Sequence, residues 1–168
     1  RRQEWSKGLD VEQTFEKIYT ERKWGRSPSG SPFYSGDGSR PENSSAYEAY
    51  VADFLNAHPE LRSLVDIGCG DFQVSERILR RLKRPVDYTG CDVAKSVVEH
   101  NAATHSRSGV RFLHLNAVDV DPPTADVVSI RQVLQHLSNA QIAAVLARLK
   151  RHYKVAIITE SLPAKLVT

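Results

Sequence analysis

The stretch that most constrains the fold of this chain is Leu64 to Phe72, which reads LVDIGCGDF. An apolar run with the length of a strand ends at Ile67 and breaks into a glycine turn before a helix-compatible segment that starts at Gln73. Glycines let the chain turn sharply and let a ligand approach the backbone, and the start of a helix offers unpaired N–H groups. The stretch therefore predicts a strand, a glycine turn and a helix that together bind a nucleoside cofactor.

The spacing of the glycines argues against a dinucleotide. A dinucleotide-binding loop has a third glycine three residues after the second, and it holds a pyrophosphate at the helix N-terminus. Here the third position is Gln73, and Asp71 puts a carboxylate where the pyrophosphate would lie, so that like charges would repel. A nucleoside that carries a positive charge and no phosphate avoids both objections. A tight turn without any ligand is the alternative that the two glycines alone leave open.

The composition suits one globular domain. The chain has 168 residues, of which 40% are hydrophobic and 26% charged, and no apolar run approaches the roughly 18 residues of a membrane span. No leader peptide opens the sequence, which favours the cytoplasm. Cys69 and Cys91 lack metal-ligand spacing, so we expect buried thiols in a reducing compartment and no metal site.

The net charge of +3 is accompanied by two basic clusters, within residues 80–84 and 148–154. Both lie near the C-terminal ends of predicted helices, where the helix dipole favours cations. In a parallel α/β unit these helix ends lie opposite the cofactor loop. We therefore expect solvated helix ends and no nucleic-acid partner. The alternative, a nucleic-acid surface, would bind in a salt-dependent way.

The segment before the glycine turn predicts a helical cap and a loop. Residues 11–20 place apolar side chains on one helical face, and a second amphipathic helix is expected at 45–57. Between them, residues 26–41 are rich in serine, glycine and proline, the composition of a linker or a mobile lid. We expect one compact domain with the cap and lid loop over residues 1–60 and a cofactor-binding core over 61–168.

From Leu64 onward, short apolar runs alternate with helical segments, the pattern of βαβ units and a mainly parallel sheet. The spacing predicts strands at 63–67, 86–91, 110–115, 126–130 and 154–159, with helices at 73–83, 94–104 and 139–150. Right-handed crossovers bring the carboxyl ends of these strands to one edge of the sheet, where ligands bind. The residues that close each strand are therefore the candidate site residues.

Two of these strand ends bear groups suited to a nucleoside. Asp92 closes the second strand, twenty-two residues after Gly70, and a carboxylate there can accept hydrogen bonds from both ribose hydroxyls. The alternative is an N-cap for the following helix. Asn116 follows the third strand, and its amide oxygen can accept a hydrogen bond from a ligand without adding charge. An Asx turn at Asn116, or Asp119 in the same role, are the alternatives.

The exit of the fourth strand supplies the remaining candidates. Arg131 and Gln132 follow this strand and are expected either to line the cofactor cleft or to make surface contacts. His136 lies one helical turn later. Its ordinary pKa near 6.5 suits a general base that accepts a proton from a hydroxyl or an amine. A structural role for His136, in capping or packing, is the alternative.

Taken together, these motifs resemble the class I S-adenosylmethionine-dependent methyltransferases. The pattern D-x-G-x-G, followed by an acid about twenty residues on, resembles their motif I. Residues 15–163 resemble one group of small members, whose hallmarks stand here as FEKIYTERKWG, SGDGS, a tyrosine-bearing helix, DIGCGDF, GCD and SIRQVLQHLS. The resemblance implies a Rossmann-like α/β fold with helices on both faces, S-adenosylmethionine as cofactor, and methyl transfer to a small-molecule acceptor by direct displacement.

The resemblance also implies roles for single residues. Trp24 and the SGDGS loop are expected to fold over the cofactor as a lid. Phe72 replaces the third glycine of the family's D-x-G-x-G-x-G form, so its ring is expected to meet the amino-acid end of the cofactor. The sulfonium is expected near an aromatic face or a carboxylate. After the third strand the family has an acid that accepts from the adenine amino group; this sequence has Asn116 there, and its amide oxygen is expected to accept the same bond. His136 is the catalytic candidate. The candidate cofactor-binding residues are Trp24, Asp66, Gly68, Cys69, Gly70, Phe72, Asp92, Val93, Asn116, Ala117, Arg131 and Gln132.

One departure from the family concerns the end of the chain. Family members continue after the fifth strand through a helix and a closing β-hairpin, whereas this sequence stops at Thr168. We expect the fold to end after the fifth strand and to leave Val155 to Thr159 as an exposed sheet edge, with either lowered stability or a homodimer contact there. Two other functions stay open: an inactive cofactor-binding module that a partner or a further segment completes, and an NAD-dependent dehydrogenase, which Gln73 and Asp71 disfavour.

Overall fold

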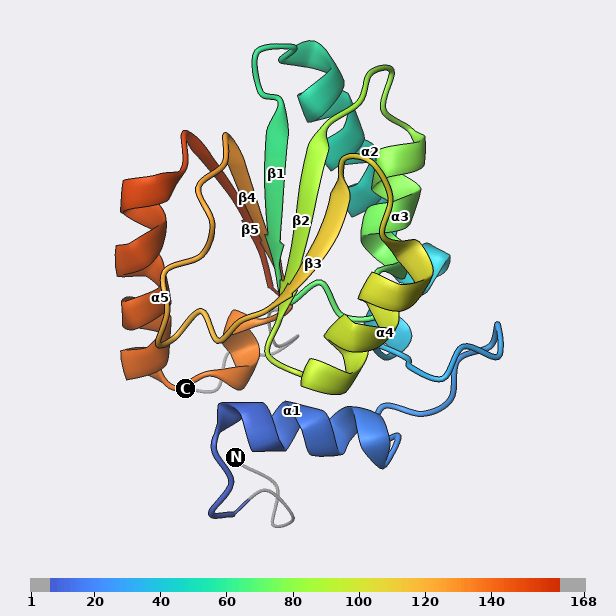
Figure 1. Ribbon diagram of the computed structural model, residues 1–168, viewed down its shortest axis with the longest axis vertical. Coiled ribbons are helices and arrows are strands. Elements are labelled where there is room, and N and C mark those ends of the chain that lie inside the picture. The colour runs from blue at the N-terminus through green and yellow to red at the C-terminus, as the bar shows by residue number, and fades with distance from the viewer. Residues whose placement is uncertain (1–6, 161–168) are drawn as a thin grey trace, which may run out of the picture.

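A computed structural model describes residues 7–160, and its centre is a five-stranded parallel sheet (Figure 1). The strands are β1 (Ser63–Ile67), β2 (Asp87–Asp92), β3 (Val110–His114), β4 (Val127–Arg131) and β5 (Val155–Thr159). Their order across the sheet is β3-β2-β1-β4-β5, and every pairing is parallel. The chain direction across the sheet reverses between β1 and β4, so ligands are expected at the carboxyl ends of these two strands.

Helices cover both faces of the sheet. They are α1 (Val11–Thr20), α2 (Pro41–Ala57), α3 (Gln73–Arg80), α4 (Lys95–His105) and α5 (Asn139–His152), with short 3-10 turns η2 (Asp37–Ser39) and η3 (Leu134–His136). In Figure 1, α2, α3 and α4 lie on one side of the sheet, α5 lies on the other, and α1 crosses the carboxyl ends of the strands. This is the expected Rossmann-like α/β fold with an N-terminal helical cap.

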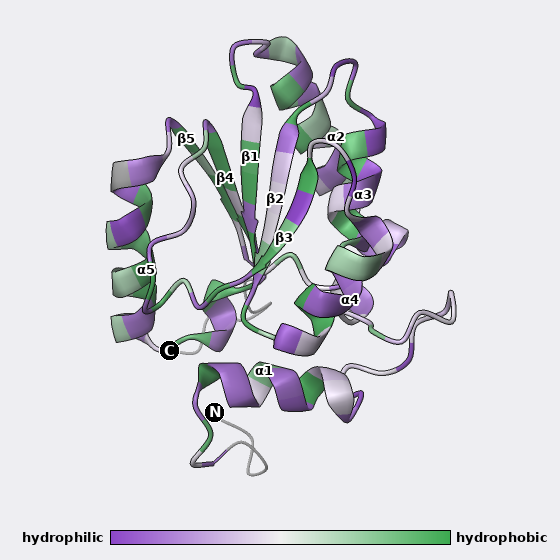
Figure 2. Ribbon diagram, viewed as in Figure 1, coloured by the Kyte–Doolittle hydropathy of each residue, from purple (hydrophilic) through white to green (hydrophobic). Residues whose placement is uncertain are grey.

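The alternation of side chains along the strands produces two main core clusters. Along β1, Leu64 packs with α2, α3 and α4, whereas Val65 and Ile67 pack with α5. Parallel strands covered on both faces are apolar on both faces, and Figure 2 shows β1, β4 and β5 largely in the hydrophobic colours. A third and smaller cluster joins Tyr19 of α1 to Ala94 and Val97 at the start of α4. The cap therefore packs outside the two main clusters.

The predicted element bounds agree closely with the structure. Each strand lies within one residue of its predicted position, and α1 has the predicted bounds. The largest difference is α2, which begins at Pro41 rather than at 45 because proline is well suited to the first helical turn. Val51 and Leu55 of α2 are fully buried in the same cluster as β1 and β2. This helix is thus a layer of the core, and α1 alone is the cap.

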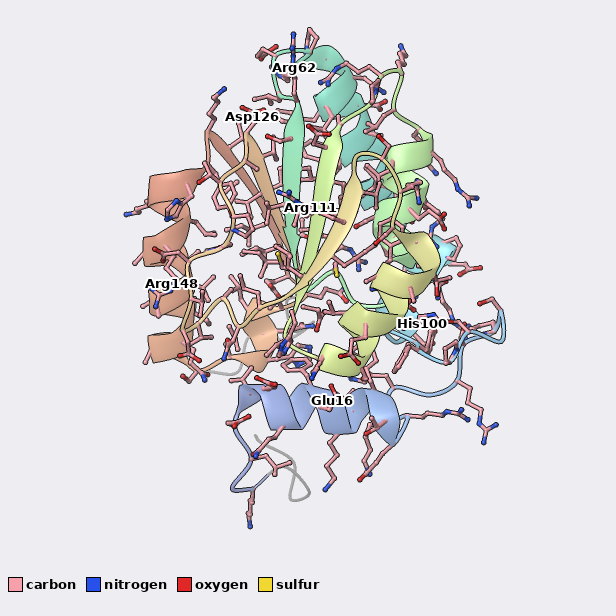
Figure 3. The ribbon with its side chains drawn as sticks, in the orientation of Figure 1. Glu16, Arg62, His100, Arg111, Asp126 and Arg148 are labelled. Atoms are coloured by element: carbon pink, nitrogen blue, oxygen red, sulfur yellow. The ribbon has the colours of Figure 1, made fainter. Side chains whose placement is uncertain are left out.

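The basic side chains at the ends of α3 and α5 are engaged with the protein itself. Arg84 donates through Nη2 to the carbonyl oxygens of Leu55, His58 and Leu61, at 3.0, 2.9 and 2.8 Å. Arg148, labelled on α5 in Figure 3, pairs with Asp121 at 3.5 Å. These contacts hold helix ends and loops in place, so Arg84 and Arg148 are half-buried structural cations and not the solvated helix ends that the sequence predicted. No helix among residues 7–160 has the length and apolar character needed to cross a membrane.

Asp126, just before β4, contacts the amino ends of β1 and β5, on the side of the sheet opposite to α1. Figure 3 shows it beside Arg62, and its Oδ2 accepts from the backbone N–H groups of Arg62 and Ser63 at 2.8 and 3.1 Å. Its Oδ1 lies 2.7 Å from Nζ of Lys154, just before β5. The ion pair with Lys154, followed by the backbone donors, lowers the pKa of Asp126 from 3.8 to about 2.

We expect Asp126→Asn to lower the free energy of unfolding by about 1 kcal/mol at neutral pH, because it removes an ion pair and weakens two charge-assisted hydrogen bonds. A carboxylate with a depressed pKa stabilises the fold fully above its unfolded pKa near 3.8, and this stabilisation is lost as pH falls through about 2. Urea denaturation of both chains at several pH values measures the difference. A difference that does not shrink between about pH 5 and pH 2 would contradict this account, and Asp53→Asn, at an exposed position of α2, is the control.

Candidate functional site

A cavity of about 290 Å³ lies at the carboxyl ends of the central strands, between them and α1. Its position is the one expected for a ligand in an open α/β sheet. Every predicted site residue except Phe72 lines it. These residues are Trp24, Asp66, Gly68, Cys69, Gly70, Asp92, Val93, Asn116, Ala117, Arg131, Gln132 and His136.

Phe72 is a correction to the sequence analysis. Its side chain is fully buried and packs in the core against the rings of Tyr88 and Phe112, with centroids 5.3 and 4.9 Å away. A φ of 66° at this residue turns the chain from the glycine loop into α3. The prediction that this ring meets the cofactor is therefore wrong, because burial among other aromatic rings stabilises it more than a half-open position would.

The acid at the end of β1 is a buried hydrogen-bond centre. Asp66 accepts from the hydroxyl groups of Ser75 in α3 and Ser129 in β4, both at 2.5 Å, and from Tyr88 in β2 at 2.9 Å. A buried carboxylate is stable only when such donors replace water. The three donors come from three different elements, so Asp66 fixes the floor of the cavity.

Asp92 holds the glycine turn and still faces the cavity. Its Oδ2 accepts from the N–H of Gly70 and its Oδ1 from the N–H of Ala94, both at 2.9 Å. Burial raises the pKa of Asp92, and these backbone donors oppose the rise. The residue is not the N-cap of α4, because that position belongs to Ala94. Each carboxylate oxygen keeps a second lone pair that can accept from a ligand hydroxyl.

The SGDGS loop, residues 35–39, is hydrogen-bonded to the glycine turn. The N–H of Ser35 donates to Asp71 at 3.1 Å, and the N–H of Asp71 donates to Oγ of Ser35 at 2.8 Å. Oγ of Ser35 also lies 3.1 Å from the hydroxyl of Tyr19 in α1. Burial raises the pKa of Asp71, which these donors oppose. The reciprocal pair brings the SGDGS loop and α1 to the cavity, as the lid interpretation requires.

Arg131 holds the same loop from the other side. Its Nη2 donates to the carbonyl oxygen of Gly38 at 2.7 Å, and its guanidinium lies 5.3 Å from the ring centre of Tyr47. Tyr47, from α2, lines the cavity, and burial raises its pKa. The sequence analysis places Tyr47 only in the amphipathic helix expected at 45–57 and Ser35 only in the lid loop, and it names neither Tyr19 nor Asp71 as a cofactor-binding residue. A tyrosine-bearing helix among the family hallmarks was the available signal for Tyr47.

Asn116 forms the Asx turn that was the alternative to an adenine contact. Its Oδ1 accepts from the N–H of Val118 at 3.1 Å, and its Nδ2 donates to Asp119 at 2.7 Å. Asn116 and Ala117 line the cavity, whereas Asp119 does not. A carbonyl oxygen has two lone pairs, so the contact of Asn116 with an adenine amino group stays a prediction.

His136 lies in the cavity wall among aromatic rings. Its ring centre is 5.5 Å from that of Phe15 in α1 and 5.8 Å from that of Trp24. Burial lowers the pKa of His136, and the negative charge of Glu160 opposes this. The imidazole is therefore neutral near pH 7 and able to accept a proton.

The charges around the cavity are mostly negative. Asp66, Asp71 and Asp92 all line the cavity, and each is less than a tenth exposed. The cation Arg131 also lines the cavity, but its guanidinium already donates to the carbonyl oxygen of Gly38 in the SGDGS loop. Buried carboxylates favour a ligand with positive charge and disfavour a phosphate. Within residues 7–160, no group of three or more histidine, cysteine, aspartate or glutamate side chains has the arrangement to hold a metal ion.

We expect Gly70→Ala to lower the free energy of unfolding by about 3 kcal/mol, because the residue has a positive φ and a Cβ there would collide with Oγ of Ser35. Gly30 is the matched control, since its φ is also positive but no atom lies within 4 Å of the Cβ position. Gly30→Ala should cost only about 1 kcal/mol. Thermal and urea denaturation measure both changes, and equal losses would refute the close packing of Ser35 on the glycine turn.

Residues 65–155, more than half of the chain, match the sequence model of a family described as the methyltransferase domain. A comparison with curated protein sequences gives no significant match. The family match covers the sheet from β1 to the start of β5, including the glycine turn, Asp92 and His136.

Solved structures share this fold. One is an amino pentose methyltransferase from Micromonospora echinaspora involved in calicheamicin biosynthesis, bound to SAM, with a TM-score of 0.58, 24% identity, and coverage of 73% of this chain and 53% of that one. Another is magnesium protoporphyrin IX methyltransferase from Synechocystis PCC 6803 with bound SAH, with a TM-score of 0.59, 14% identity, and coverage of 86% and 68%. The cyclase SpnF is also similar, with a TM-score of 0.63, 19% identity, and coverage of 89% and 60%.

At these identities the structural matches establish the fold. This chain spans about half the length of the first solved structures that it matches. The fold inferred from the glycine turn and the alternating strands is confirmed, and so is the family that the motifs resemble. The chain belongs to the methyltransferase domain family, with the class I, Rossmann-like architecture.

Proposed function

We propose that this chain binds S-adenosylmethionine in the cavity and transfers its methyl group to a small-molecule acceptor. The observation that carries the proposal is Asp92, a buried carboxylate that faces the cavity beside Gly70 and keeps lone pairs for the two ribose hydroxyls. Family membership and solved relatives that are bound to SAM or SAH support the same cofactor.

The charge around the cavity supports this cofactor over a dinucleotide. A sulfonium is compatible with three buried carboxylates, whereas the pyrophosphate of NAD would lie against them. Gln73 also stands where a dinucleotide loop has its third glycine, and its side chain is used to donate to Asp71 at 2.8 Å. The dehydrogenase alternative therefore has no support from the site.

The chemistry follows from positioning. S-adenosylmethionine, when bound, supplies a methyl group on a positively charged sulfur. Asp92 would hold the ribose, Asn116 and Ala117 would lie along the adenine, and the glycine turn with Asp66 would border the amino-acid end. α1, Trp24 and the SGDGS loop exclude water from the cavity. Neutral His136 accepts the proton that an acceptor hydroxyl or amine releases.

The remaining assignments follow the same reasoning. The acceptor is a small molecule, because the cavity has the size of a small-molecule site and the named relatives include enzymes of small-molecule metabolism. The unpaired, buried thiols of Cys69 and Cys91 suit the reducing cytoplasm. The sequence-based division, a cap and lid over residues 1–60 and a cofactor-binding core over 61–168, changes in one respect: α2 packs in the core, so α1 and the loop that follows it supply the cap and lid.

Calorimetric titration with S-adenosylmethionine, its demethylated product and NAD tests the proposal. We expect micromolar binding of the first two and none of NAD. Asp92→Asn should weaken binding by about thirtyfold, equivalent to about 2 kcal/mol, because an amide has one acceptor oxygen where the carboxylate has two. Asp87→Asn is the matched control, since Asp87 is exposed at the other end of β2.

The outcomes separate the alternatives. Binding of NAD, or equal affinities of Asp92→Asn and the unaltered chain, would refute the cofactor assignment. If S-adenosylmethionine binds but no methyl reaches any of a panel of hydroxyl and amine acceptors, the inactive-module alternative is favoured. Thermal denaturation of each variant shows whether lost binding reflects a lost fold.

We also propose that the outer edge of β5 pairs with a second copy of the chain. β5 pairs with β4 on one side, and among residues 7–160 no strand pairs with its other edge. Ile158 on this strand is 39% exposed. Sedimentation should show a concentration-dependent dimer that Ile158→Lys weakens, with Val120→Lys, at an exposed valine outside the strands, as control. A monomer whose β5 amides are protected from exchange would contradict this.

A further inference from the structure

The carboxylate of Glu160, one residue beyond β5, receives the backbone N–H groups of three consecutive residues. Its Oε1 accepts from Val133 at 3.0 Å and from Leu134 at 2.8 Å, and its Oε2 accepts from Gln135 at 3.3 Å. The first N–H groups of a helix find no acceptor inside the helix, and a carboxylate is a strong acceptor for them. Glu160 thus fixes the start of η3 from the neighbouring strand.

The residue just before these three groups has a strained backbone. Gln132 has a φ of 55°, a left-handed conformation that glycine adopts more easily. Such a conformation persists where surrounding contacts hold it. Here the N–H of Gln132 donates to the carbonyl oxygen of Thr159 at 2.8 Å, and the next three N–H groups are bound by Glu160. The end of β5 therefore holds the whole turn that follows β4.

This turn is one wall of the cavity. Leu134 is buried in the core and anchors it. The residues of the turn that line the cavity are Gln132, Val133, Gln135, His136 and Leu137. Any loosening of the turn would therefore move His136 relative to the cavity.

Glu160 also supplies charge near His136. The groups packed on the imidazole from α1 and the following loop are the uncharged rings of Phe15 and Trp24, and its sequence neighbour Gln135 is also uncharged. Among the described residues, Glu160 is the charged group that acts on the pKa of His136: its negative charge favours the protonated imidazole and so raises this pKa.

We propose that Glu160 is a positioning residue: its carboxylate holds the turn at residues 132–137 and so directs His136 toward the cavity. The link to methyl transfer rests on the proposed function. The positioning itself rests only on the contacts of this chain.

Two substitutions separate geometry from charge. Glu160→Gln keeps an acceptor oxygen and the side-chain volume but removes the charge, and Glu160→Ala removes both. The titration of the His136 imidazole is followed by proton NMR without any ligand, and the signal is assigned by its loss in His136→Asn. We expect the pKa of His136 to fall in Glu160→Gln. Glu99→Gln, which removes an exposed charge on α4, should leave it unchanged.

Binding measures the geometric part. We expect Glu160→Ala to weaken binding of the demethylated cofactor product by about tenfold and Glu160→Gln to restore most of this loss, because the cavity wall keeps its acceptor. Where an acceptor is known, kcat of Glu160→Gln should fall by about tenfold while KM for S-adenosylmethionine changes by less than about threefold.

An unchanged His136 pKa in Glu160→Gln together with unchanged product affinity in Glu160→Ala would overturn the proposal. A change in either readout, absent in Glu99→Gln, supports the corresponding part of it. Because the NMR titration needs no cofactor, a chain that transfers no methyl group would refute the proposed function and leave this test intact.

Discussion

The carboxylate of Asp66 is the constraint on which the centre of the molecule depends. It is nearly inaccessible to solvent and is satisfied by hydroxyl groups from α3, β2 and β4. A buried carboxylate that lost these donors would destabilise the fold, so the four elements are bound to one relative position. That position sets where β1 ends and the glycine turn begins, and hence where the cavity lies.

Two further carboxylates extend this scheme outward from the core. Asp92 binds the N–H of Gly70, and Asp71 exchanges hydrogen bonds with Ser35. Each acid thus holds backbone or loop groups while it faces the cavity. The same groups that give the site its negative charge give it its shape, because hydrogen-bond donors from the protein are what make burial of these acids tolerable.

The sequence was sufficient to predict the fold and to select residues that, apart from Phe72, line one cavity, because both depend on local patterns. Strands of apolar residues, glycine turns and acids at strand ends follow from periodicity and spacing, and the topology then gathers the strand ends at one edge. Phe72 was misassigned because its place in the motif says nothing of its rotamer or of the neighbouring rings of Tyr88 and Phe112. Tertiary packing, and not the position in the motif, determines where the ring of Phe72 lies.

Contacts between segments that are distant in the sequence could not be predicted from it either. Ser35 and Asp71 are 36 residues apart, and no periodicity indicates that a loop serine will bind that acid. The same holds for Glu160, which is 26 residues from Leu134. Such hydrogen bonds depend on how the loops pack against the folded sheet, which is a tertiary property.

The packing of α1 has a consequence for how such a site could diversify. α1 joins the rest of the chain through its own small cluster, apart from the two clusters that hold the sheet, yet Val11, Phe15 and Tyr19 reach the cavity. Substitutions at Val11 and Phe15 can reshape the cavity without disturbing the two main core clusters, so they should change the free energy of unfolding little. The shape of this side of the cavity and the stability of the sheet thus depend on largely separate parts of the chain, so the cavity can change while the sheet stays the same.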